Sequence, residues 1–169
     1  MSETKLAIAR PRRRAALAAT SAAPLSDAVS SRGARRFLRG LASADLLEDV
    51  RSGAHTLIVP VDRAFDALPW SFDALLTHDA LVETRVDLFE YLVVRGLVPE
   101  CEAGAPYRTL HSTDVWIGPD AVFGRYGAAR ILRSVRSPRQ VILFVDRLIF
   151  ASAPRRDLVG ARQEMDATP

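Results

Sequence analysis

The stretch TLIVPVDRAF, residues 56–65, decides how the rest of the chain is interpreted. Residues of high strand propensity run into Pro60, which has no backbone N–H to donate to a neighbouring strand. Asp62 follows as a candidate cap for a short helical turn, and Phe65 and Leu68 fall on one side of that turn. The stretch therefore predicts a buried strand that passes directly into a helical turn packed on the same core.

Helical periodicity is visible on both sides of this strand. Apolar residues recur at spacings of three and four over residues 37–50, which predicts two short helices before the strand. The same spacing over residues 81–92 predicts one longer helix after it. Residues 91–95 lose that spacing and predict a short strand closed by Gly96.

The last third of the chain is rich in short strand patterns. Four runs with alternating polar residues, separated by Gly, Pro, Asp and Ser, are typical of an antiparallel meander with one face in water. These runs are residues 107–110, 114–118, 121–123 and 129–133. The run 141–150 is apolar almost throughout and is interrupted only by Asp146 and Arg147. It predicts a central strand buried on both faces.

The composition predicts one domain with two tails. The chain has 169 residues, of which 49% are hydrophobic and 25% are charged, as in ordinary globular proteins. Residues 1–30 are expected to form a basic, solvated arm that resembles a weak export signal, residues 31–154 the domain, and residues 155–169 a polar tail. Without a convincing signal peptide, localisation stays open between the cytoplasm and export. No apolar run is long enough to span a membrane.

Charge and reactive side chains exclude several function classes. The formal net charge is +3 and Lys5 is the only lysine, so the basic residues are almost all arginines. An arginine stripe from 125 to 139 has no aromatic motif interleaved with it, which argues against nucleic-acid binding. Three scattered histidines and one cysteine, Cys101, give no metal-ligand spacing and no nucleophile context. The sequence therefore predicts no cofactor and no metal, and it favours a protein that is not an enzyme.

Three segments resemble the fasciclin domain family, over about residues 28–154. The first is residues 56–65, which match the signature T-V-F-A-P-T-D-x-A-F at Thr56, Pro60, Asp62, Ala64 and Phe65. Residues 88–96 resemble the segment L-x-x-Y-H-V-V-x-G, and residues 141–149 resemble the signature V-I-H-V-I-D-x-V-L. All three occur in the family's order.

The departures from the family pattern remove polar side chains. Leu92 stands where the family has a histidine after Tyr91, and Leu143 stands where it has a histidine in the last strand. Each change keeps an apolar or strand-forming residue while deleting a hydrogen-bonding group. The scaffold is therefore expected to be retained while the polar features have diverged.

The resemblance implies an α+β fold in which short helices pack on a compact antiparallel β-sandwich or wedge. It also implies a non-enzymatic adhesion or interaction domain with a protein or matrix partner. The alternative is the binding or biosynthetic conversion of a hydrophobic small molecule, such as a carotenoid- or polyketide-like ligand, in an apolar pocket at Leu92 and Leu143. The signature residues, for which structural roles are favoured over binding, are Thr56, Pro60, Asp62, Phe65, Tyr91 and Asp146.

The two main hypotheses make different structural predictions. An interaction domain predicts an exposed apolar or basic patch. A ligand-binding protein predicts a concave apolar site beside Leu92 and Leu143.

Overall fold

The central strand stops where the sequence predicts that it stops. The computed structural model describes residues 29, 33–99 and 105–154, and in it β1 (His55–Pro60) is buried from Thr56 onward and ends at Pro60. The 3₁₀ helix η1 (Asp62–Ala67) follows immediately and buries Phe65. Apart from Val29, which is buried in the core, the expected basic arm lies outside the described residues, as do Cys101 and the polar tail.

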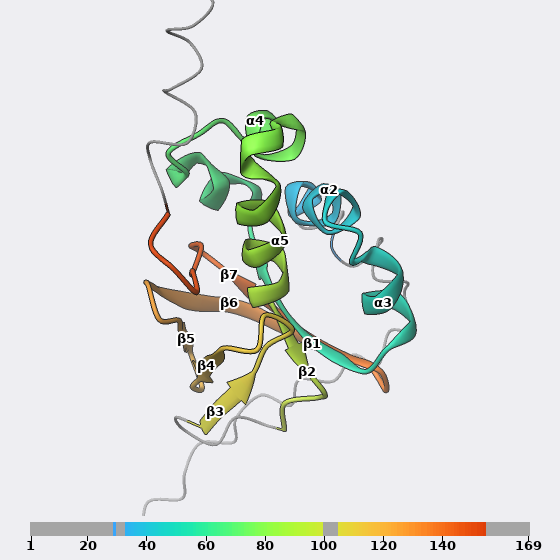
Figure 1. The fold of residues 1–169 in the computed structure, drawn as a ribbon. Coiled ribbons are helices and arrows are strands. Elements are labelled where there is room, and N and C mark those ends of the chain that lie inside the picture. The colour runs from blue at the N-terminus through green and yellow to red at the C-terminus, as the bar shows by residue number, and fades with distance from the viewer. Residues whose placement is uncertain (1–28, 30–32, 100–104, 155–169) are drawn as a thin grey trace, which may run out of the picture.

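Helices and strands occupy different sides of the molecule, as Figure 1 shows. The helices are α2 (Arg35–Ser43), α3 (Leu47–Ser52), α4 (Phe72–Thr77), η2 (Asp79–Leu81) and α5 (Val82–Tyr91). The remaining strands are β2 (Val93–Arg95), β3 (Ala105–Arg108), β4 (Asp114–Ile117), β5 (Ala121–Phe123), β6 (Ala128–Arg136) and β7 (Gln140–Val145). This arrangement confirms the α+β fold class.

The seven strands form one curled sheet in the order β2-β1-β7-β6-β5-β4-β3. An isolated bridge between Val94 and Thr109 links the two ends of this order, so the sheet is almost closed. Five of the six strand pairs are antiparallel, as expected, but β1 and β7 run parallel, with Thr56 opposite Val141 and Pro60 opposite Val145. Parallel strands are usually covered on both faces, which explains why both of these strands are apolar.

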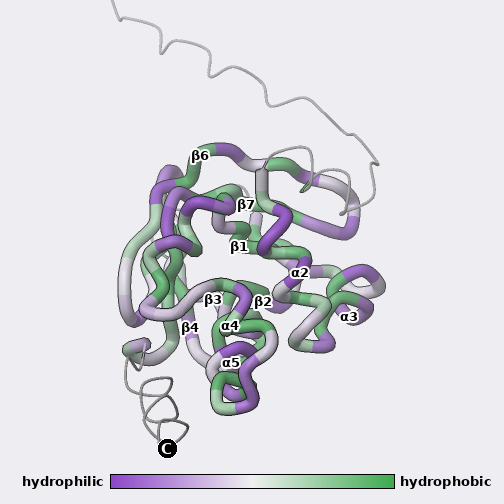
Figure 2. Tube along the Cα trace, turned by 90° about the horizontal axis from the view of Figure 1, so that it is seen from above, coloured by the Kyte–Doolittle hydropathy of each residue, from purple (hydrophilic) through white to green (hydrophobic). Residues whose placement is uncertain are grey.

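The burial pattern follows from this order. Residues 141–145 of β7 are all buried, whereas β6 carries both hydrophilic and hydrophobic residues and is mostly exposed or half-buried (Figure 2). Between the helices and the sheet, the rings of Phe37, Phe65 and Phe89 pack together, with centroids 6.1 and 6.3 Å from that of Phe89. This aromatic cluster joins α2, η1 and α5 into one core.

Asp62 caps a helix, but not the helical turn that the sequence suggests. Its own turn has no side-chain cap. Its Oδ1 instead accepts the backbone N–H of Arg36 in the first turn of α2 at 2.8 Å, and its own N–H donates to the Gly33 carbonyl at 2.7 Å. The abrupt end of β1 places η1 against the start of α2, which has no cap of its own.

Candidate binding surface

The signature residues Thr56, Pro60 and Phe65 are buried and take part in the packing of the fold. Thr56 is fully buried, and its hydroxyl donates to the Gly96 carbonyl at 3.0 Å and accepts the Val98 N–H at 2.8 Å. Pro60 ends a buried strand, and Phe65 is only 1% exposed. None of these side chains presents a polar group to a ligand.

Asp146 holds a strand end rather than a ligand. Its Oδ1 accepts the Arg130 N–H at 2.8 Å, and its own N–H donates to the Arg130 carbonyl at 3.2 Å. Its other oxygen lies 4.0 Å from the Arg130 Nε. The carboxylate therefore fixes β6 beside the end of β7.

Tyr91 ties the end of α5 to two segments of the strand region. Its hydroxyl donates to the Asp114 carbonyl at 3.2 Å and accepts the Arg125 N–H at 2.9 Å, while the residue is fully buried. Burial raises the pKa of the Tyr91 hydroxyl above its ordinary value of 10.0, and the hydrogen bond from Arg125 offsets part of this rise. A Cβ at Gly124 would lie 3.3 Å from this hydroxyl, so the glycine allows the close approach.

Tyr91→Phe is expected to lower the free energy of unfolding by about 1–2 kcal/mol at neutral pH, because two backbone groups lose their partner. The unfolded state releases its tyrosine proton near pH 10 and the folded state only at higher pH, so this residue makes the wild type lose stability above pH 10. Tyr91→Phe should lack the part of the stability decrease above pH 10 that the ionisation of Tyr91 causes. Urea unfolding at neutral pH and above pH 10 measures both effects.

Tyr126→Phe is the control for this measurement, because Tyr126 is 44% exposed. It should leave the neutral stability and the alkaline loss unchanged. Equal alkaline losses in the wild type and in Tyr91→Phe would contradict the assignment.

Leu92 and Leu143 fill the core. They are 0% and 2% exposed, and the Leu92 carbonyl accepts the N–H of Ile58 in β1 at 2.8 Å. Neither residue lines either of the two pockets described below. The apolar-pocket hypothesis therefore finds no cavity at these leucines.

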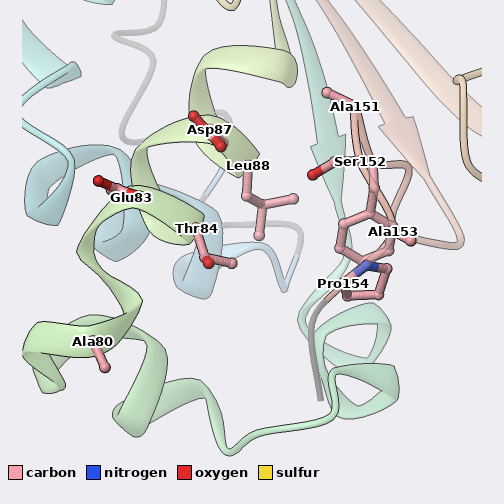
Figure 3. A pocket seen from close by; sticks show the side chains of 10 residues that line it. Ala80, Glu83, Thr84, Asp87, Leu88, Ala151, Ser152, Ala153 and Pro154 are labelled. Atoms are coloured by element: carbon pink, nitrogen blue, oxygen red, sulfur yellow. The ribbon is translucent and has the colours of Figure 1, made fainter. Parts of the chain in front are cut away.

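Two surface pockets combine polar or charged side chains with apolar ones. One, of about 150 Å³, lies between α5 and residues 150–154, where Figure 3 shows the side chains of Glu83, Asp87 and Ser152 around it. Its lining includes no histidine to act as a base for the serine. The other, of about 350 Å³, has Arg36 and Arg39 on its wall, but these already pair with Asp66 and Asp73.

The most distinctive surface is an exposed aromatic row across the curled part of the sheet. Trp116 on β4 pairs directly with Phe123 on β5, and the two are 43% and 50% exposed. The row continues with Pro106 opposite Trp116 and with Ala128 opposite Phe123. Directly opposed residues share one face of a sheet, so the four side chains form a continuous apolar strip. We call this strip and its charged flanks the aromatic face.

Charged residues flank the strip on both sides. Arg108 and Asp114 pair across β3 and β4 on one side, with 3.3 Å between Nη1 and Oδ1. Arg130, opposite Ala121, lies on the other side. The reverse side of these strands is buried, with Val115, Ile117, Val122 and Ala129 in the core. These strands thus have one face in the core and one aromatic face in solvent.

Exposed apolar side chains concentrate around this face. Among the described residues, the large hydrophobic residues that remain exposed are Val82, Leu97, Trp116, Phe123, Tyr126 and Leu132. The last four belong to β4, β5, β6 and the turn between β5 and β6. Clusters of exposed apolar side chains on soluble proteins mark interaction sites more often than scattered ones do.

Sequence reasoning identified the arginine stripe but missed Trp116 and Phe123. The exposure of Trp116 follows from the alternation of side chains along a strand. Val115 and Ile117 point into the core, so Trp116 between them must point outward. The same applies to Phe123, which follows the buried Val122. Predicting that Trp116 and Phe123 lie opposite each other requires the register of β4 against β5, which the sequence alone does not give.

Two further findings bear on function. Within residues 29, 33–99 and 105–154, no group of three or more His, Cys, Asp or Glu side chains is placed to hold a metal ion. The helices in these residues are also too short or too polar to cross a membrane.

Comparison with solved structures supports the fold. No protein-family model matches the sequence, and neither does any curated protein. A solved structure of a FAS1 domain pair from the insect cell adhesion molecule fasciclin I matches with a TM-score of 0.56 at 14% sequence identity. The match covers 71% of this chain and 46% of the length of that one, which contains two domains. The likeness shows a fasciclin-like fold.

Proposed function

We propose that this chain is a non-enzymatic protein-binding domain that contacts its partner through the aromatic face. The observation that carries the proposal is the cross-strand pair of Trp116 and Phe123, both about half exposed on a rigid sheet. Aromatic and arginine side chains dominate the binding energy of protein interfaces, and both are present here. The similar structure comes from a cell adhesion molecule, which agrees with a role in binding.

The sheet is suited to this role because it is rigid. Its reverse side packs into the core, so the aromatic side chains keep their positions without a partner. Little conformational entropy is then lost when they bind. The alternative, a carotenoid- or polyketide-like ligand bound or converted in an apolar pocket, has no observation in its favour among the described residues.

Site-specific photocrosslinking tests the proposal. A benzoylphenylalanine at position 123, in the full chain expressed in its own host, is expected to form a discrete adduct with a partner protein. The same group at position 82 is the matched control, because Val82 is also exposed, at 40%, but lies on α5. Adding Trp116→Ser should reduce the adduct at position 123 by at least about tenfold, as for an interface hot spot. No adduct, or equal adducts at both positions, would overturn the proposal.

A further inference from the structure

We infer that the partner segment bound by the aromatic face is acidic, with carboxylates that pair with arginines around the strip and apolar side chains that cover Trp116 and Phe123. This inference rests on the proposed function and adds the chemistry of the partner.

Charge is divided unequally between the two parts of the molecule. Residues 105–154, which contain the aromatic face, carry seven arginines and three aspartates, a formal charge of +4. Residues 33–99, which contain the helices, carry seven arginines and ten acidic residues, a formal charge of −3. A partner approaching the strand part therefore meets a positive field, which favours a negatively charged surface.

Arginines beside the strip are available for new partners. Arg108 Nη1 donates to the Ser112 carbonyl at 2.8 Å and pairs with Asp114 at 3.3 Å, but the two charged side chains are 60% and 44% exposed, and such exposed interactions are weak. Arg130 is 70% exposed, and its Nε lies 4.0 Å from the Asp146 carboxylate. The guanidinium of Arg125 lies 6.0 Å from the centre of the Tyr126 ring, in the turn that follows Phe123. Each guanidinium can donate two parallel hydrogen bonds to a partner carboxylate at small cost.

The composition of the strip favours a protein segment over a nucleic acid. Pro106 and Ala128 are exposed beside the aromatic pair, and aliphatic surfaces suit leucine- or aromatic-containing peptides better than stacked bases. Asp114 lies in the same face as the pair and would repel a phosphate backbone. A peptide partner can place an apolar side chain or a hydrogen-bond donor beside Asp114.

Fluorescence anisotropy with a labelled copolymer tests the inference. The probe is a random copolymer of glutamate and tyrosine, and the protein is the full chain. Arg125→Glu combined with Arg130→Glu is expected to weaken binding by about tenfold or more, because two attractions become repulsions. Trp116→Ser should weaken it by a similar factor. Homopolymeric glutamate, which lacks apolar groups, should bind the wild type less tightly than the copolymer.

A control pair of substitutions separates surface chemistry from net charge. Arg51→Glu combined with Arg63→Glu changes the charge by the same amount on exposed residues of the helical part, and binding should stay within about twofold of the wild type. Circular dichroism of each variant establishes that it is folded.

Three outcomes would overturn the inference. These are no copolymer binding by the wild type, equal loss in the control pair, and equally tight binding of a single-stranded oligothymidine with the same dependence on Arg125 and Arg130. If the copolymer fails while the adduct at position 123 depends on Trp116, the partner is not acidic and the proposed function stands. If the copolymer does not bind and no Trp116-dependent adduct forms at position 123, the proposed function is wrong as well.

Discussion

Replacing Gly40 by alanine is expected to lower the free energy of unfolding by about 2–3 kcal/mol, although alanine is the better helix former. Gly40 is buried in α2, and a Cβ at this position would overlap the outer edge of the Phe89 ring on α5. Phe89 is fully buried against Phe37 and Phe65, so its ring has no free space to move into. Overpacking of this kind costs more than the roughly 1 kcal/mol that helix propensity returns.

Urea unfolding of matched variants measures this effect. Gly118→Ala is the control, since its Cβ would make an ordinary contact of 3.5 Å, and it should change stability little. Combining Gly40→Ala with Phe89→Leu should cost less than the sum of the single changes, because the smaller side chain gives the methyl group room. If Gly40→Ala leaves the free energy of unfolding unchanged or raises it, the prediction is wrong and α2 and α5 can move apart at little cost.

Leu143→His, which restores the residue found in the fasciclin signature, is expected to lower the free energy of unfolding by about 3–4 kcal/mol at neutral pH. Leu143 is 2% exposed, at the centre of β7 beside Ile58 of β1. The substitution removes apolar burial and places an imidazole among apolar side chains without a partner. A stable variant would mean that a polar environment survives at this position.

The same variant should show a pH dependence that the wild type lacks. Burial disfavours the protonated imidazole, so its pKa falls below the unfolded value of about 6.5. The unfolded state then binds more protons below pH 6.5, and stability decreases further as the pH falls. Urea midpoints at pH 8 and pH 5.5 measure the difference. A histidine at the exposed position Val82 is the control and should give a much smaller difference.

The sequence predicted the parts of this fold that depend on local pattern. The strand that ends at Pro60 and the helical turn that follows it at once are specified by neighbouring residues. Asp62 was predicted as a cap, but the helix that it caps begins 27 residues earlier, and no local pattern specifies that contact. The direction of β7 relative to β1 was missed for the same reason.

The candidate site was predicted less well than the fold. The resemblance directed attention to Thr56, Tyr91, Asp146 and the two leucines, whose side chains are all buried or engaged within the protein. Trp116 and Phe123 belong to no signature, and their importance appears only when two strands come into register. Function on such a scaffold depends on which side chains the solvent face carries, and family signatures record mainly the core.

The parallel pairing of β1 with β7 sets the order in which the molecule can fold. Thr56 and Val141 are neighbours in the sheet although about 85 residues of chain separate them. Closing so long a loop costs entropy before any contact repays it, and chains with many such contacts fold slowly. During synthesis, the apolar β1 must wait for most of the chain to leave the ribosome before its central neighbour exists. Until then the edge of β1 opposite β2 stays unpaired and apolar, and protecting that edge from aggregation is the main folding problem that this topology creates.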